Sequence, residues 1–312
     1  MLSVVVPVHN EERSVALLYD ELRSALEPTG EAWEAVFVDD GSTDGSFGAL
    51  TRLHAATTNV RVVRLRRNFG KAAALASGFA HARGETIVTI DADLQDDPAE
   101  IPRLLVKLEE GYDLVSGWKA RRQDPFRRRL LSRIFNRVVA TVSGVRLHDM
   151  NCGLKAYHAD VVRGLPLYGE LHRFLPVLAH QRGFRIAELP VNHRPRGYGR
   201  SRYGIERYLR GFFDLLTVSF LGRYRYRPLH LLGGLGLVLS IVGLGTLVYL
   251  TVVKAQGHAI GGRPLLVLGV LLVVVGIQVF SLGLLGELIA GQHAERVGER
   301  EAAELHVEEV LS

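Results

Sequence analysis

Short apolar runs alternate with helical patterns over the first part of the chain. Ser3–Val6 is an almost continuous apolar run, and Glu12–Leu26 then repeats leucine and valine at helical spacing. Further strands are expected at 35–38, 61–65, 86–90 and 113–116, and further helices at 46–54, at 72–82 and from Asp97-Pro98 onward. Apolar strands that alternate with helices indicate an α/β fold with a mainly parallel sheet, covered by helices on both faces.

The hydropathy pattern changes near the end of the chain. Residues 229–253 contain no Asp, Glu, Lys or Arg, and residues 264–288 contain none before Glu287, so each uncharged stretch is longer than the roughly 20 residues that cross a bilayer. We expect two transmembrane helices within 229–290. Arg223, Arg225 and Arg227 precede the first stretch, whereas the connecting loop holds only Lys254 and Arg263. The positive-inside rule therefore predicts a multi-pass plasma-membrane protein whose N-terminal domain, residues 1–203, and C-terminal tail, residues 291–312, are cytoplasmic.

The segment between these parts, residues 204–228, has an amphipathic pattern. One helix face would carry six apolar or aromatic side chains, Ile205, Tyr208, Leu209, Phe212, Leu216 and Phe220. We interpret the segment as interfacial, lying at the membrane surface. A surface helix packed on the N-terminal domain is the alternative. Small residues in the first span would allow close packing within or between chains, so a homo-oligomer is a plausible assembly: Gly233, Gly234, Gly236, Gly243 and Gly245.

Charge and cysteine content narrow the class of protein. The net charge is +5, and arginines gather at 121–137 and 194–227, close to the apolar stretches. This placement favours a membrane surface or a phosphate ligand over nucleic acid, because aromatic RNA-binding motifs and zinc spacings are absent from the sequence. Cys152 is the only cysteine, and no secretory signal pattern precedes the first strand, so an oxidising compartment is not indicated.

Two of the predicted strands end in carboxylates. Asp91 and Asp93, with Gln95 nearby, follow one strand, and Asp39 with Asp40 follows another. Ligands bind at the carboxyl ends of strands in open α/β sheets, and such oxygens suit a hard cation that also takes oxygens from a diphosphate. The alternative is turn and helix-cap chemistry. It accounts well for Asp44, Ser46, Asp96 and Asp97, but it does not account for Asp91.

Four ordered motifs carry a family resemblance: Val4–Glu12 (VVVPVHNEE), Val38–Asp44 (VDDGSTD), Arg67–Lys71 (RNFGK) and Asp91–Gln95 (DADLQ). They resemble the family 2 glycosyltransferases, whose catalytic domain has the Rossmann-like GT-A fold. Two later motifs, Asp149–Tyr157 and Pro190–Tyr203, resemble the polyprenyl-phosphate (dolichol-phosphate mannose synthase-like) branch. The resemblance covers residues 2–215, and two closing spans match the bacterial members.

The resemblance implies roles for particular residues. Pro7, Asn10 and Glu11 would border the nucleobase, with Asp39 on base or ribose. Asp91 would contact ribose or sugar. The remaining nucleotide-sugar contacts would come from Asp40, Ser42, Lys71, Ala92, Asp93 and Arg202.

Asp93 and Gln95 would hold Mg²⁺ or Mn²⁺ on the diphosphate. Arg202 stands where the family usually has lysine, and it would close over the same diphosphate. Asp149 resembles an active-site carboxylate that orients the sugar or an arginine. The expected catalytic set is therefore Asp91, Asp93, Asp149 and Arg202.

The implied acceptor is a polyprenyl phosphate of the undecaprenyl, decaprenyl or dolichyl type. Residues 121–139 are basic and striped with apolar side chains, which suits a bilayer surface and an anionic head group. Arg122, Ser132 and Arg133 are the candidates for the acceptor phosphate, although a solvated charged face would explain part of this pattern. The expected reaction is inverting transfer of a hexose from UDP-glucose or another UDP-hexose, with GDP-mannose as an alternative donor, for cell-envelope glycosylation.

Two other functions remain open from the residues alone. A processive polysaccharide synthase would share the N-terminal motifs, but Gln181–Arg185 does not provide its Gln-x-x-Arg-Trp pattern. A non-catalytic membrane scaffold that binds nucleotide-sugar is the other alternative. Kinase and dehydrogenase functions are disfavoured, because no Walker loop exists and no Gly-x-Gly-x-x-Gly follows the first strand.

Overall fold

The computed structural model of the 312-residue chain forms two compact units, Met1–Val218 and Ser219–Ser312. It describes residues 1–120, 137, 139–141, 143–163, 165, 167, 169, 171–194, 228–260 and 264–296. The proposed interfacial segment 204–228, apart from Pro228, and the tail beyond residue 296 lie outside the described residues, and so do Arg122, Ser132, Arg133 and Arg202.

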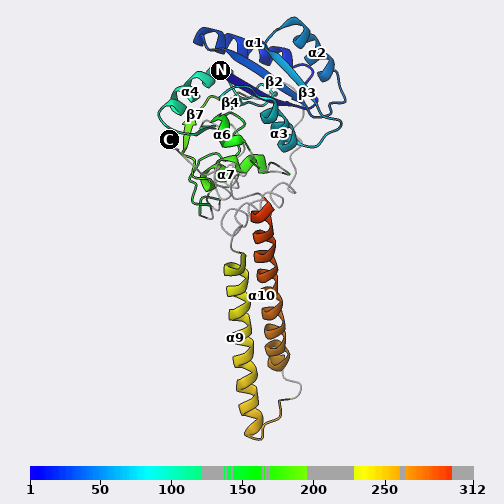
Figure 1. Ribbon diagram of the computed structural model, residues 1–312, viewed down its shortest axis with the longest axis vertical. Coiled ribbons are helices and arrows are strands. Elements are labelled where there is room, and N and C mark those ends of the chain that lie inside the picture. The colour runs from blue at the N-terminus through cyan, green and yellow to red at the C-terminus, as the bar shows by residue number, and fades with distance from the viewer. Residues whose placement is uncertain are drawn as a thin grey trace. The chain divides into compact units, whose positions relative to one another are not determined.

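A seven-stranded sheet forms the centre of the described part of the first unit (Figure 1). Its spatial order is β3-β2-β1-β4-β6-β5-β7. β6 is antiparallel to both of its neighbours, and every other pair of adjacent strands is parallel. The strands are β1 (Leu2–Val8), β2 (Trp33–Asp39), β3 (Val60–Arg64), β4 (Thr86–Thr89), β5 (Leu114–Trp118), β6 (Lys155–His158) and β7 (Ile186–Pro190). The prediction of a mainly parallel sheet is confirmed.

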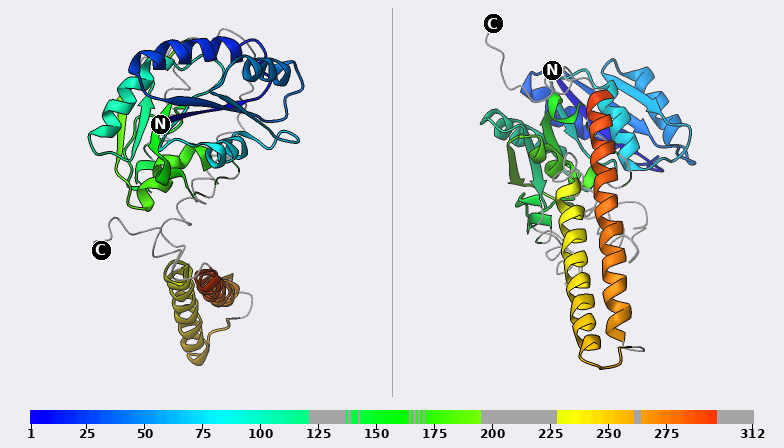
Figure 2. Two further views of the ribbon diagram at one scale, coloured as in Figure 1. Left: turned by 45° about the horizontal axis from the view of Figure 1, so that its top comes forward. Right: turned by 60° about the horizontal axis from the view of Figure 1, so that its bottom comes forward.

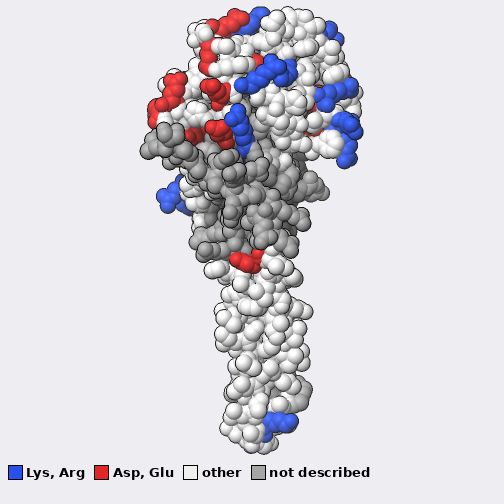
Figure 3. All heavy atoms as spheres, viewed as in Figure 1, with Lys and Arg blue, Asp and Glu red and all other residues white. Residues whose placement is uncertain are grey.

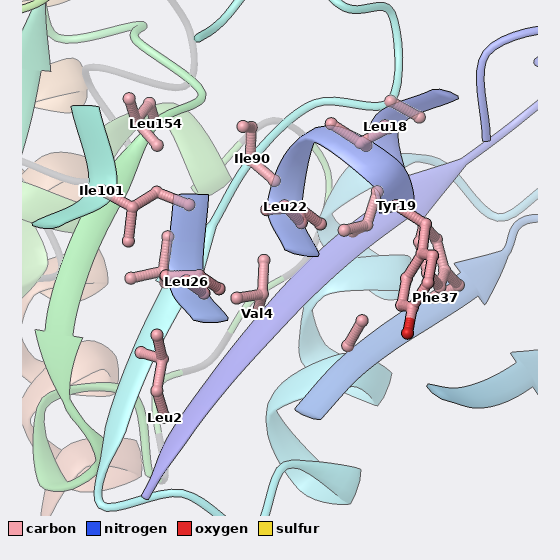
Figure 4. Packing of buried hydrophobic residues seen from close by; sticks show 14 of the residues in the cluster. Leu2, Val4, Leu18, Tyr19, Leu22, Leu26, Phe37, Ile90, Ile101 and Leu154 are labelled. Atoms are coloured by element: carbon pink, nitrogen blue, oxygen red, sulfur yellow. The ribbon is translucent and has the colours of Figure 1, made fainter. Parts of the chain in front are cut away.

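Helices cover both faces of this sheet, which explains why β1 is apolar at successive positions. Val4 and Val6 pack with α1 (Val15–Leu26), α2 (Ser46–Ala56) and α4 (Ile101–Glu109) on one face. On the other face, Val5 packs with α3 (Lys71–His81), α6 (Ala159–Val162) and α7 (Leu175–Gln181). Short 3₁₀ turns occupy Glu27–Thr29, Pro98–Glu100 and Leu171–Phe174. Figure 4 shows the first face, where Leu18, Leu22 and Leu26 of α1 lie over Val4 and Phe37.

Two boundaries differ from the sequence pattern for local reasons. α1 begins at Val15 instead of Glu12, because the backbone N–H groups of Glu11 and Glu12 donate hydrogen bonds to Ser46 and Asp44 in the loop after β2. The helix expected after Asp97 starts with the 3₁₀ turn and continues as α4. Asp97 caps it as predicted, since its carboxylate accepts the N–H of Ala99 at 3.1 Å.

The second unit contains two long helices, α9 (Pro228–Ala255) and α10 (Pro264–Arg296). Their apolar stretches, Leu229–Ala255 and Pro264–Ile289, have mean hydropathies of 2.2 and 2.8 and are only 17% and 11% buried. The core helix of a soluble protein would be mostly buried, whereas these helices expose apolar side chains over most of their surface. Figure 3 shows charged side chains only near the two ends of the pair. Both helices are therefore long and apolar enough to cross a membrane, as predicted.

Glycines allow α9 and α10 to pack closely side by side (Figure 2). A Cβ atom built on Gly236 would lie 2.5 Å from the carbonyl oxygen of Gly276 and 2.6 Å from the backbone nitrogen of Phe280. In the same way, a Cβ atom built on Gly243 would lie 2.8 Å from the carbonyl oxygen of Gly269. Small residues at these positions let two helix backbones approach without side chains between them.

We expect Gly236→Leu to separate these helices. Overpacking typically lowers the free energy of unfolding by about 1–3 kcal/mol, because neighbouring backbone atoms cannot move aside. Gly234→Leu is the matched control, since no heavy atom lies within 4 Å of a Cβ at that position. Thermal unfolding of the full chain in detergent, followed by circular dichroism, should show a lower midpoint for Gly236→Leu only. Equal midpoints for the two variants would contradict the described packing.

Candidate active site

The loops singled out in the sequence meet at one edge of the sheet. β1, β2, β4 and β5 are parallel, so their carboxyl ends lie together, and the amino end of the reversed strand β6 reaches the same edge. The first-strand loop at 9–12, the carboxylates after β2 and those after β4 are therefore neighbours. The reversal of β6 adds residues 149–155 to this group, which the strand pattern alone did not predict.

The first loop is fastened to the loop that follows β2. The N–H of Asn10 donates to Ser42 Oγ at 3.0 Å, and Asn10 Oδ1 accepts the N–H of Thr43 at 2.8 Å. Glu11 donates its N–H to Ser46 Oγ at 2.8 Å. Pro7, at the end of β1, pairs in register with Val38. The structure thus brings together Pro7, Asn10, Glu11 and Ser42, which the family resemblance assigns to the nucleotide.

Asp39 is a buried carboxylate at the end of β2. Its Oδ1 accepts the N–H of Ser42 at 3.1 Å. Its Oδ2 lies 3.5 Å from Arg64 Nε but has no hydrogen-bond partner within the described residues. A buried acceptor without a hydrogen bond is energetically unfavourable, by about 1–3 kcal/mol. An N–H or O–H group of a ligand would satisfy this oxygen.

Asp40 holds a different loop in place. Its two carboxylate oxygens accept the backbone N–H groups of Phe69 at 2.7 Å and Gly70 at 2.9 Å. Gly41 beside it has a φ of 62°, and a Cβ there would lie 2.4 Å from the backbone of Arg67. Asp40 therefore fixes the chain that leads into α3, whose first residue is Lys71.

Lys71 forms an ion pair with Asp91, and both side chains are about one-third exposed. The carboxylate of Asp91 lies directly against Gly153, where a Cβ atom would be only 2.6 Å from Asp91 Oδ2. Thr89, the last residue of β4, donates a hydrogen bond from Oγ1 to the carbonyl of Gly153 at 2.9 Å. Asp91 is thus held between a lysine on one side and a glycine on the other.

The Asp93–Gln95 turn has an unusual backbone. Leu94, its central residue, has a φ of 60°, and the N–H of Gln95 donates to Asp93 Oδ1 at 3.2 Å. Within the described part of the chain, Leu94 and Asn10 are the non-glycine residues with positive φ. Such backbone is strained and concentrates at functional sites, and here it occurs in the two loops that the motifs single out. Ala92, which precedes this turn, is buried in the core.

The oxygen ligands near this turn suit a divalent cation only in part. No group of three or more His, Cys, Asp or Glu side chains among the described residues is arranged to hold a metal ion. Asp93 and Gln95 offer one carboxylate and one amide oxygen. Mg²⁺ and Mn²⁺ are commonly held in this way, by one or two protein oxygens with the rest from phosphate and water. The residues therefore fit a cation that arrives with a diphosphate.

Asp149 lies in the turn before β6, and the carboxylate of Glu188 in β7 fixes its backbone. The carboxylate of Glu188 accepts the backbone N–H of Asp149 at 2.8 Å and that of His148 at 2.9 Å. Asp149 is buried, and its Oδ1 accepts the N–H of Asn151 at 3.1 Å. Asp149 thus lies in a hydrogen-bonded turn before β6, at the sheet edge that also carries Asp39 and Asp91, and its role stays a prediction.

Two lysines of this region, Lys155, which is buried, and Lys119, which is largely buried, were not assigned a role from the sequence. Lys155 begins β6 and donates a hydrogen bond to the carbonyl of Cys152, and burial lowers the pKa of its ammonium group. Lys119 follows β5 and pairs with Asp96 at 2.8 Å. Despite burial, which would lower it, the pKa of Lys119 is raised by the charge of Asp96. The interpretation of Asp96 as a helix-cap residue is wrong, because Asp97 provides the cap and Asp96 is buried in this ion pair.

The matching family model is glycosyl transferase family 2, over residues 3–164, and the chain belongs to this family. It is 41% identical to the dodecaprenyl-phosphate galacturonate synthase of Rhizobium johnstonii, over 93% of this chain and 87% of that protein. It is 36% identical to the undecaprenyl-phosphate 4-deoxy-4-formamido-L-arabinose transferase of Salmonella paratyphi B, over 92% of this chain and 88% of that protein. The resemblance drawn from the motifs, to the polyprenyl-phosphate branch of this glycosyltransferase family, is confirmed.

Solved structures agree on the fold. The glucosyl-3-phosphoglycerate synthase of Mycobacterium tuberculosis, in complex with Mn²⁺, uridine diphosphate and phosphoglyceric acid, matches with a TM-score of 0.56 at 21% identity. The match covers 71% of this chain and 78% of that one. The catalytic domain therefore has the expected GT-A-type α/β fold.

Proposed function

We propose that this enzyme transfers a hexose from a nucleotide-sugar to a polyprenyl phosphate, with inversion at the anomeric carbon. One observation carries the proposal: Asp39, Asp91 and Asp93 gather at one sheet edge in a chain that also has two membrane-length helices. The acceptors in the names of both relatives, dodecaprenyl and undecaprenyl phosphate, support the same reaction class. Both relatives match along nearly the whole chain.

The donor would lie across the loops that follow β1, β2 and β4. Asp39 Oδ2 is the buried acceptor available to an N–H of the base or a hydroxyl of the ribose. Pro7, Asn10, Glu11 and Ser42 would border the base. Asp91, fixed by Lys71 and Gly153, would accept a hydrogen bond from a hydroxyl of the ribose or sugar.

Asp93 and Gln95 would hold the divalent cation, which neutralises charge on the leaving diphosphate when it is bound. Ala92, between Asp91 and Asp93, is buried. Lys71 and Arg202 would contribute further positive charge to the same diphosphate. A preorganised site of this kind accelerates transfer by stabilising the charge that develops as the glycosidic bond breaks.

The acceptor phosphate is a nucleophile that needs no general base. The second pKa of a phosphate monoester is near ~6, so the group is already mostly dianionic at neutral pH. The work of the protein is then to bring this phosphate to the anomeric carbon. Arg122, Ser132 and Arg133 are proposed to bind it, and Asp149 to orient the sugar or an arginine. We place this site on the cytoplasmic side of the plasma membrane, where nucleotide-sugars are made.

The test is a donor screen with the purified full chain. The chain is incubated with undecaprenyl phosphate in detergent, with Mn²⁺ or Mg²⁺ and with one radiolabelled donor at a time. The label that enters the organic phase is then counted. The donors are UDP-glucose, UDP-galactose, UDP-galacturonate, GDP-mannose and a UDP-linked 4-formamido pentose. We expect one UDP-hexose to label the lipid much faster than the others. If no donor labels the lipid while the chain binds nucleotide, the proposed reaction is wrong.

A further inference from the structure

A buried ion pair lies beside the Asp93–Gln95 turn. Asp96 has none of its surface exposed, and the side chain of Lys119 is only 13% exposed. Asp96 Oδ1 lies 2.8 Å from Lys119 Nζ and 3.5 Å from His193 Nδ1. Burial of two charges is unfavourable by itself, and replacement by apolar residues often stabilises a fold. A buried pair at this place therefore suggests a role other than stability.

Asp96, Lys119 and His193 connect three segments of the chain that the proposed reaction needs together. Asp96 directly follows Gln95, one of the two candidate metal ligands. Lys119 directly follows β5, just before the arginine-rich segment 121–139 that is proposed to bind the acceptor. His193 follows β7, and the chain continues from there toward Arg202.

Backbone contacts strengthen the link between the turn and the chain after β7. Asp96 and His193 form an isolated antiparallel β-bridge, and the N–H of Arg194 donates to the carbonyl of Gln95 at 2.8 Å. Arg194 also pairs with Asp97 at 2.7 Å and with Glu21 of α1 at 2.8 Å. Each residue from Gln95 to Asp97, directly after the strained Leu94, is thus held by a contact with another segment of the chain.

We infer that Lys119, through its ion pair with Asp96, is a positioning residue that holds the metal-binding turn against the end of β5. The inference rests on the proposed function, because it takes Asp93 and Gln95 as the metal ligands. In this role Lys119 is not itself a metal ligand. It acts through Asp96, as partners behind a metal ligand orient the ligand itself.

Metal binding without lipid tests this inference. Mn²⁺ binding to the full chain in the presence of UDP is measured by electron paramagnetic resonance of free Mn²⁺, with GDP as a second probe. Loss of such a supporting contact typically weakens metal binding by about 10–100-fold. We therefore expect Lys119→Met and Asp96→Asn each to weaken Mn²⁺ binding at least about tenfold, and the double variant to be no weaker than Lys119→Met alone. Lys119→Arg, which keeps the charge, should recover part of the affinity.

Glu34→Gln is the matched control. Glu34 is also buried and charged, accepts hydrogen bonds from Ser3 Oγ and the N–H of Arg83 at 2.7 Å, and pairs with Arg61 at 3.6 Å. It lies near the beginning of β2, at the opposite edge of the sheet. We expect Glu34→Gln to lower the unfolding temperature with Mn²⁺ affinity unchanged.

Unchanged Mn²⁺ affinity in folded Lys119→Met would overturn the inference. If Lys119→Met does not fold, Lys119→Arg and Asp96→Asn decide by the same measurement. Failure of the proposed function gives a different result. The wild-type chain would then not label lipid, while the Mn²⁺ affinity of Lys119→Met would still be lower than that of Glu34→Gln.

Discussion

Replacement of Asp93 by alanine should reduce sugar transfer by about 10²–10³-fold or more, the loss typical when one group that stabilises transition-state charge is removed. Asp93 is half-buried in the turn after β4, and its Oδ1 accepts the N–H of Gln95, two residues further along the same turn. Folding of the variant is checked by circular dichroism before its rate is measured. The reduction should appear in kcat at saturating donor, measured as the initial rate of lipid labelling with Mn²⁺ present.

Asp20→Ala is the control for this experiment. Asp20 lies on α1, its side chain is 61% exposed, and it pairs with Arg23 at 3.5 Å on the same helix. Removing that carboxylate should leave transfer within about twofold of wild type, since exposed ion pairs contribute little. A near-normal rate for folded Asp93→Ala, with metal present, would refute the assignment of Asp93 as a metal ligand.

A methyl group at Gly153 should have the second largest effect. The Cβ of alanine would lie 2.6 Å from Asp91 Oδ2 and 2.7 Å from Asp91 Cγ, which is closer than any stable contact. Either Asp91 or the turn that carries Asp149 must then move. Displacement of a reacting group by about 1 Å can reduce the rate about 10²-fold, and we expect Gly153→Ala to lower kcat/KM by that order.

Gly48→Ala provides the comparison. Gly48 lies in α2, where a Cβ atom would have only Arg52 Nη1 nearby, at 3.6 Å, so alanine there should be tolerated and should slightly favour the helix. Initial rates over a range of donor concentrations distinguish the two variants. Wild-type kinetics for Gly153→Ala would show that the close approach of Gly153 does not set the position of Asp91.

The acidic strand ends could be predicted because they depend on one general rule. Parallel strands bring their carboxyl ends to the same edge, so Asp39 and Asp91 were expected at one edge of the sheet once their strands were recognised. The membrane-length helices could be predicted equally well, because a run such as 264–286, which contains no charged residue, has few alternatives. These are local patterns with a single structural consequence.

The part of the site around β6 could not be predicted in this way. Lys155–His158 is four residues long, and its alternation does not reveal whether the strand runs with or against its neighbours. Its reversal places Gly153 against Asp91. The Asp96–Lys119 pair is similar, because the partners are distant in the sequence and the acidic run at 96–97 suggests helix capping for both of its members. Burial, which distinguishes Asp96 from Asp97, depends on the assembled sheet.

The choice of acceptor is the most direct test of the proposed reaction. The purified chain, with its preferred donor and Mn²⁺, is given undecaprenyl phosphate or undecaprenol at the same concentration in detergent. We predict labelled lipid only from the phosphate, as a phosphodiester that resists phosphatase and releases its sugar in mild acid. Equal labelling of undecaprenol, or label found in a polymer that stays out of the organic phase, would contradict the proposal.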